Sequence, residues 1–120
     1  MIKILLKFNQ KVLKKFETDK DKITIGRLKD NDIHINNPSV SRQHAQIIKN
    51  LGNYLIEDLK STNGLYLNKV RTATSYLKDG DVITIEKYAL VVNIKTENGN
   101  NITLSPDGEI QLIRSKSSSS

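Results

Sequence analysis

The chain has 120 residues, of which 37% are hydrophobic and 27% charged, a composition typical of one globular domain with a single core. It contains no cysteine, which excludes disulfides, thiolate catalysis and cysteine-ligated metal sites, and no apolar run is long enough for a membrane-spanning helix. The formal net charge of +6 favours an anionic partner, although lysines spread along a sequence also serve simply to keep a surface hydrated.

The N-terminal segment from Ile2 to Phe8 predicts a strand rather than a targeting signal. Lys3 and Lys7 interrupt its apolar residues, so it lacks the continuous apolar core of a signal peptide. The same residues alternate apolar with other types, as in a strand that buries one face. We therefore expect a first strand here and a cytoplasmic location.

Short β-like segments follow along the chain. Asn9-Gln10 predicts a turn into a second strand, and the strands after the first are expected at 12–17, 23–25, 33–35, 45–48, 54–56, 65–67, 82–85 and 89–94. Turn-forming residues separate several of them, at 36–38, 51–53 and 79–81. No segment has a sustained helical period, so the pattern predicts an all-β sandwich or barrel.

The composition changes after Ile94. Residues 96–101 are polar, and Ser105-Pro106-Asp107-Gly108 between two short apolar runs predicts a hairpin over 102–113. The serine-rich tail at 116–120 has no apolar residue and is expected to be disordered. We therefore divide the chain into a domain at 1–95 and a C-terminal extension at 96–120.

Four polar motifs lie at the predicted strand ends, in the order Gly26-Arg27, Ser41-Arg42-Gln43-His44, Ser61-Thr62-Asn63-Gly64 and Asp79-Gly80-Asp81. A phosphate monoester carries about −1.5 to −2 charges and three strong acceptor oxygens. Binding it requires a guanidinium together with hydroxyl and amide donors on rigid loops, and the first three motifs supply these groups. The pattern therefore indicates a phosphate-binding site built from loops.

In this order and spacing, the four motifs resemble the forkhead-associated (FHA) family over about residues 2–94. The resemblance implies an FHA-type β-sandwich of about eleven strands. It also implies a phosphothreonine-dependent interaction module in signalling, which binds proteins or peptides, has no catalytic activity and uses no cofactor.

By position, the resemblance assigns the principal ligands. Arg27 and Ser41 match the phosphate ligands, and Thr62 matches a third that acts through its hydroxyl. Asn63 matches the residue that holds the backbone of the bound peptide.

Five further positions match the family. Arg42 corresponds to a residue that assists peptide or phosphate binding, and Ser39 to one that helps select the side chain three residues after the phosphothreonine. Gly26, His44 and Gly64 match architectural positions.

One dipeptide departs from the family pattern. Asn68-Lys69 stands where Asn-Gly is common before the next strand. A two-residue turn of that kind requires positive φ at both positions, which lysine disfavours. We therefore expect a longer turn or one of another type.

Each ligand position also has a structural interpretation that the sequence leaves open. Arg27 and Arg42 are of a type that often serves only as surface charge. Ser41 is able to cap a turn through its hydroxyl, and Asn63 to tie its loop through its amide. Thr62-Asn63-Gly64 also suits a simple turn.

Other functional classes fit less well. Ser41, His44 and Asp58 have the residue types of a hydrolase triad, but the nucleophile elbow Gly-x-Ser-x-Gly is missing. His34 and His44 lack companion ligands for a metal. For nucleic-acid binding, the sequence lacks a basic strand face with aromatic residues on which bases could stack. The main alternative is an FHA-fold scaffold that binds partners without phosphate.

Overall fold

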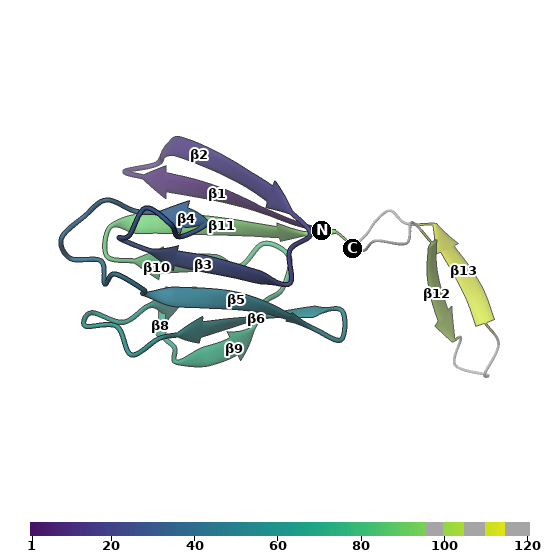
Figure 1. Ribbon diagram of the computed structural model, residues 1–120. Coiled ribbons are helices and arrows are strands. Elements are labelled where there is room, and N and C mark those ends of the chain that lie inside the picture. Colours follow the sequence, from purple (N-terminus) through teal and green to yellow (C-terminus); the bar gives the residue numbers. More distant parts are fainter. Residues whose placement is uncertain (96–99, 105–109, 115–120) are drawn as a thin grey trace.

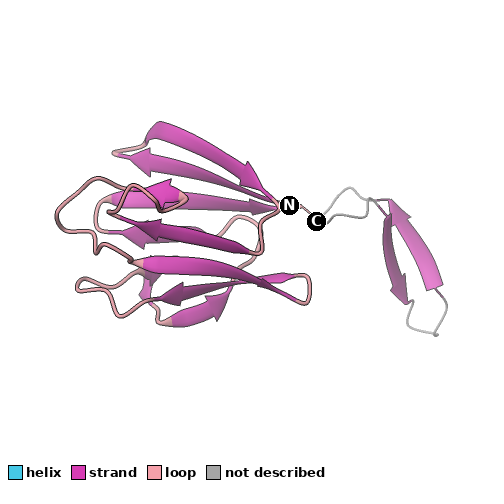
Figure 2. Cartoon of the chain, in the orientation of Figure 1, coloured by secondary structure: helices cyan, strands magenta, loops and turns pink. Residues whose placement is uncertain are grey.

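The computed structural model describes residues 1–95, 100–104 and 110–114, and in those ranges it contains strands but no helix (Figure 2). Accordingly, no helix in the described part of the chain is long and apolar enough to cross a membrane. The first eleven strands are β1 (Ile2–Phe8), β2 (Lys11–Thr18), β3 (Lys22–Gly26), β4 (Ile33–His34), β5 (Ala45–Asn50), β6 (Asn53–Asp58), β7 (Tyr66–Leu67), β8 (Val70–Arg71), β9 (Thr74–Tyr76), β10 (Val82–Ile85) and β11 (Tyr88–Ile94).

These eleven strands form two sheets that pack face to face (Figure 1). One has six strands in the order β2-β1-β11-β10-β7-β8, and the other has five in the order β4-β3-β5-β6-β9. All pairings are antiparallel except that of β3 with the two-residue β4. The predicted all-β sandwich of about eleven strands is confirmed.

Alternation of apolar residues explains the sandwich. In β1, the inward-facing Ile2, Ile4 and Leu6 are buried, whereas the residues between them are partly exposed. Strands of both sheets contribute aliphatic side chains in the same way, so the core is built from isoleucine, leucine and valine with Tyr54 as its aromatic residue. β-branched residues suit such pleated, half-buried surfaces.

The turn at Asn68-Lys69 corrects the expectation drawn from the sequence. It has two residues and joins β7 to β8, with φ of 49° at Asn68 and 73° at Lys69. Asn68 fixes this geometry, because its Nδ2 donates to Asp81 Oδ1 at 2.9 Å and its Oδ1 accepts from Val82 N–H at 3.0 Å. These bonds hold the backbone at positive φ, a conformation that lysine by itself disfavours. The prediction of a longer or different turn was therefore wrong.

Two short strands, β8 and β9, were not expected from the sequence.

In the C-terminal extension, β12 (Asn100–Leu104) and β13 (Ile110–Arg114) pair antiparallel with Ile102 opposite Leu112. The hairpin expected at 102–113 overlaps these two strands, but its turn lies outside the described residues, so the hairpin remains a prediction. The expected disorder at 116–120 lies outside the described residues, and the division at residue 95 remains a prediction.

The two ends of the sandwich differ in what they carry. The loops that follow β3 and β6 lie at one end, and the N-terminus lies at the other (Figure 1). There the first and last residues of the sandwich are joined, since Lys95 N–H donates to the Met1 carbonyl at 3.1 Å. The loops that carry the first three motifs are therefore remote from the point where the chain enters and leaves the sandwich. The fourth motif lies near that point instead, since Asp79 Oδ1 accepts from Ile94 N–H at 2.9 Å.

Candidate functional site

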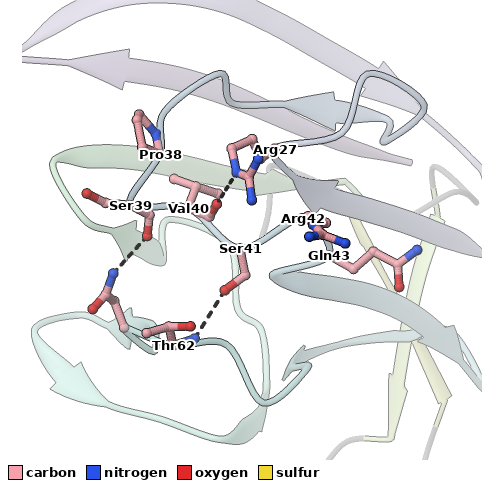
Figure 3. A pocket seen from close by; sticks show the side chains of 9 residues that line it. Arg27, Pro38, Ser39, Val40, Ser41, Arg42, Gln43 and Thr62 are labelled. Atoms are coloured by element: carbon pink, nitrogen blue, oxygen red, sulfur yellow. Dashed lines mark hydrogen bonds between the residues drawn. The ribbon is translucent and has the colours of Figure 1, made fainter.

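The loops that carry the first three motifs, at 26–27, 41–44 and 61–64, surround a depression of about 410 Å³ (Figure 3). Its lining residues are Arg27, Pro38, Ser39, Val40, Ser41, Arg42, Gln43, Thr62 and Asn63. All six side chains that the sequence singled out for peptide or phosphate binding are thus brought together. Pro38, Val40 and Gln43 were missed, because nothing in their types signals a binding role.

Arg27 is fixed at the end of β3 by the loop opposite. Its backbone N–H donates to the Ser41 carbonyl at 3.0 Å, and its Nε donates to the Val40 carbonyl at 2.9 Å (Figure 3). Within the described residues its two terminal amino groups donate no hydrogen bond. The guanidinium is therefore oriented by the protein while most of its donors remain available to an anion.

Gly26 allows the Arg27 loop to approach this closely. A Cβ at Gly26 would lie 2.9 Å from the carbonyl carbon of Arg42 and 2.8 Å from Asn31 Nδ2, and still closer to the Arg42 oxygen. Asn31 is buried and donates through Nδ2 to the carbonyls of Leu28 and Arg42, at 3.0 and 2.9 Å. Any residue with a Cβ at position 26 would push these segments apart.

Asn31 and Asn37 shape the site but were not identified from the sequence. Asn37 Oδ1 accepts from Ser39 N–H at 2.8 Å, and its carbonyl accepts from Val40 N–H at 2.9 Å, which bends the loop beside the pocket. Asn37 lay within a predicted turn, whereas Asn31 lies in a polar stretch that resembles any surface loop. Only the fold reveals that its amide is enclosed.

Ser41 connects the two loops across the pocket. Its Oγ accepts a hydrogen bond from Thr62 N–H at 3.1 Å, which leaves the Ser41 hydroxyl proton available for a ligand (Figure 3). The Thr62 side chain is exposed. Asn63 Nδ2 donates to the Ser39 carbonyl at 2.8 Å. Asn63 thus ties the two loops together, as its structural interpretation from the sequence allowed. Its Oδ1 and second amide proton are left over for a peptide backbone.

His44 lies fully buried beneath the pocket. Its Nδ1 accepts from Ser41 N–H at 3.1 Å, and its Nε2 lies 2.7 Å from the Gly64 carbonyl, which only a protonated Nε2 satisfies. The ring therefore links both pocket loops. Asp58 accepts instead from the Ser61 hydroxyl. Ser41, His44 and Asp58 consequently do not form a hydrolase triad.

Gly64 ends the second pocket loop in a conformation that favours glycine, with φ of +78°. Its N–H donates to Ser61 Oγ at 2.9 Å, and the Arg71 side chain covers its α-carbon. Each of the three positions expected to be architectural therefore has a structural feature of its own. Gly26 allows the backbone to approach closely, His44 bridges the loops from a buried position, and Gly64 adopts a left-handed turn.

The chemistry of the pocket is that of an anion site. Arg27 and Arg42 line it, no acidic residue does, and the remaining lining groups include two hydroxyls from Ser41 and Thr62. His34 lies apart on β4, and among the described residues no group of three or more potential metal ligands occurs. The arrangement is suited to binding a phosphate together with a short stretch of peptide.

Comparison with known proteins gives consistent matches. The FHA domain model matches residues 23–86, just over half of the chain. The oxoglutarate dehydrogenase inhibitor of Corynebacterium jeikeium is 38% identical over 77 residues, which cover 64% of this chain and 54% of that protein. The transcriptional regulatory protein EmbR of Mycobacterium tuberculosis is 40% identical over 79 residues, 62% of this chain and 20% of EmbR. The chain thus spans about half, or less, of these relatives' lengths.

Solved structures agree with the sequence matches. The FHA domain of FhaA, complexed with the intracellular domain of Rv3910, superposes with a TM-score of 0.70 at 27% identity, covering 78% of this chain and all of that one. Mycobacterium tuberculosis EmbR in complex with a low-affinity phosphopeptide gives 0.70 at 32% identity, covering 80% of this chain and 25% of EmbR. With its sandwich, its loop site and the family match over residues 23–86, this chain belongs to the FHA domain family.

Proposed function

We propose that this chain is a phosphothreonine-dependent protein–protein interaction module in signalling. The observation that carries the proposal is the Arg27 guanidinium in a pocket that Ser41 and Thr62 also line. The Val40 carbonyl holds it, and its terminal amino groups donate to no other described residue. Solved relatives support it, since one is described as EmbR with a phosphopeptide and another as an FHA domain in phosphothreonine-dependent interactions.

In this proposal each lining residue has a separate task. Arg27 supplies charge and paired donors to the phosphate, while the hydroxyls of Ser41 and Thr62 donate to its remaining oxygens. Asn63 holds the peptide backbone and Arg42 assists with charge. Ser39 lies at the edge of the same pocket and helps to select the side chain three residues after the phosphothreonine.

The FHA domain is a binding module rather than a catalytic family. We accordingly propose that the chain has no enzymatic activity, acts in the cytoplasm, and binds its partner without nucleic acid or membrane. Because its net charge is +6, a salt titration is informative. Binding to nucleic acid would weaken steeply with salt, whereas a phosphopeptide reader would still discriminate between peptides of equal charge.

The alternative proposal is a scaffold of FHA fold that binds partners without phosphate. It is favoured by the bonds that tie the two loops to each other, from Thr62 N–H to Ser41 and from Asn63 to the Ser39 carbonyl. The two proposals are separated by a degenerate phosphothreonine peptide library tested beside its unphosphorylated counterpart. Enrichment restricted to the phosphorylated library supports the phosphothreonine reader, and equal retention of both supports the scaffold.

A further inference from the structure

Arg71 presents an oriented positive charge beside the proposed site. It stands on β8 directly opposite Tyr66 of β7, and its guanidinium carbon lies 5.9 Å from the centre of the Tyr66 ring. A Cβ built on Gly64 would meet Nε, Cζ and Nη2 of Arg71 within 3 Å. The planar group thus lies close to both an aromatic ring and the α-carbon of Gly64, a setting that favours arginine over lysine.

Apart from its contact with the Tyr66 ring, the charge of Arg71 has no partner among the described residues. The residue is exposed, and in the described ranges its guanidinium takes part in no ion pair and no hydrogen bond. A guanidinium has five donors in a fixed fork that matches a carboxylate. Because the ring and the glycine already hold the group, a ligand would lose less conformational freedom by ordering it.

The position of Arg71 relates it to the pocket. Gly64, which it covers, directly follows Thr62 and Asn63, and both of these line the pocket. Adjacent α-carbons are only about 3.8 Å apart, so a peptide that passes over Asn63 reaches the Arg71 side chain within a few residues. Arg71 does not itself line the pocket, so a phosphate held by Arg27 would leave it free for a second group.

We propose that Arg71 is a specificity-determining residue that binds the carboxylate of an aspartate or glutamate flanking the phosphothreonine in the same peptide. This inference rests on the proposed phosphothreonine recognition and extends it with a substrate preference. It assigns a ligand-binding task to a strand residue outside the four sequence motifs. The exposed setting implies a modest gain of about two- to fivefold for one acidic residue.

The test is a set of phosphothreonine peptides with alanine flanks, in which one flanking position at a time carries glutamate or glutamine. Calorimetry gives the ratio of the two affinities for wild type, Arg71→Gln and Lys69→Gln. Lys69 is an exposed neighbour in the β7–β8 turn, so its variant matches the change in net charge. At one position the ratio should reach about two- to fivefold in wild type and Lys69→Gln and fall to one in Arg71→Gln.

A reversed-charge pair provides an independent readout. In Arg71→Glu, lysine at the same peptide position should bind better than glutamine, which a role limited to covering Gly64 would not produce. An Arg71→Gln variant that weakens glutamate and glutamine peptides by the same factor, or a wild-type ratio of one at every position, would overturn the inference alone. Equal binding of phosphorylated and unphosphorylated glutamine peptides would overturn the proposed function as well.

Discussion

His44 Nε2 donates a 2.7 Å hydrogen bond to the carbonyl of Gly64, twenty residues away and on the opposite loop of the pocket. Because Nδ1 simultaneously accepts from Ser41 N–H, one buried ring sets the separation of the two loops. The proposed phosphate site therefore depends on a buried group that does not line the pocket.

Replacing His44 by alanine should damage stability and, through it, recognition. The change leaves the Gly64 carbonyl and the Ser41 N–H without their partner, which destabilises the fold by about 1–3 kcal/mol. Thermal unfolding should show an earlier transition, and peptide affinity should fall. His34→Ala, on β4, is the control and should change neither. Unchanged stability with lost binding would instead make His44 a direct ligand.

Arg27→Ala and Ser41→Ala should each remove detectable phosphopeptide binding while the fold is retained. Each takes away charge-assisted bonds worth about 1.5–3 kcal/mol, and modules of this kind bind with about −8 kcal/mol in total, near micromolar. Calorimetry with a phosphothreonine peptide measures the loss, and circular dichroism checks the fold. Lys29→Ala alters an exposed cation of the same loop and should bind as wild type does. Two mutants with wild-type affinity would contradict the site assignment.

Gly26→Ala should disrupt both stability and binding. The new methyl group would press against the Arg42 carbonyl and the enclosed amide of Asn31, so the loop that carries Arg27 must shift. Overpacking of this kind costs about 1–3 kcal/mol. Denaturant unfolding gives the change in stability, and peptide titration gives the change in affinity. A Gly26→Ala protein with wild-type stability would mean that the loops separate freely.

Asp32 should make the fold sensitive to acid. Burial raises the pKa of Asp32, but hydrogen bonds from Lys20 and Thr24, together with the Lys20 charge, outweigh it and hold that pKa below its ordinary value of 3.8. A lowered pKa stabilises the folded state above the unfolded value, and this stabilisation disappears as the pH falls through the folded value.

Asp32→Asn should therefore unfold more easily than wild type near neutral pH, and the difference should shrink as the pH falls below about 3.8. Urea titrations at several pH values measure it. Asp30→Asn, at an exposed neighbouring position, is the control that should leave the profile unchanged. A difference between Asp32→Asn and wild type that stayed constant down to the lowest pH would argue against this linkage.

Phosphothreonine should bind more tightly than phosphoserine. Both would present the same phosphate to Arg27, so discrimination must come from the methyl group, and the exposed Pro38 supplies apolar lining. Burying one methyl is worth about 0.8 kcal/mol, and the stiffer χ1 of threonine adds to it, which gives about tenfold in all. One peptide made with phosphothreonine, phosphoserine, phosphotyrosine or plain threonine tests this. Equal affinity for the first two would remove the methyl argument.

The sequence predicts the sandwich because its long strands carry local signals. Apolar alternation marks β1, β10 and β11, and turn residues mark the gaps between strands. The edge strands lack these signals: Val70 and Arg71 of β8 are exposed, as are Thr74 and Tyr76 of β9. Such short elements exist because a neighbouring strand pairs with them, and that pairing depends on distant parts of the chain.

The same distinction applies to the site. The ligand types are visible in the sequence because phosphate chemistry demands arginine and hydroxyl groups at strand ends. The supporting residues are not visible, since Asn31 and Asn37 belong to polar stretches of ordinary composition. Their importance arises from enclosure by loops that meet only in the folded protein. Lys69 shows the converse. It has poor turn propensity, but hydrogen bonds of the neighbouring Asn68 with Asp81 and Val82 hold the turn in place.

The pairing of Met1 with Lys95 has a consequence for assembly into larger proteins. A unit whose two ends leave from one point can be inserted between other folded segments with little distortion of either neighbour. That point lies at the end of the sandwich opposite the loops that follow β3 and β6 (Figure 1). The sandwich thus separates the loops that line the pocket, at one end, from Met1 and Lys95 at the other.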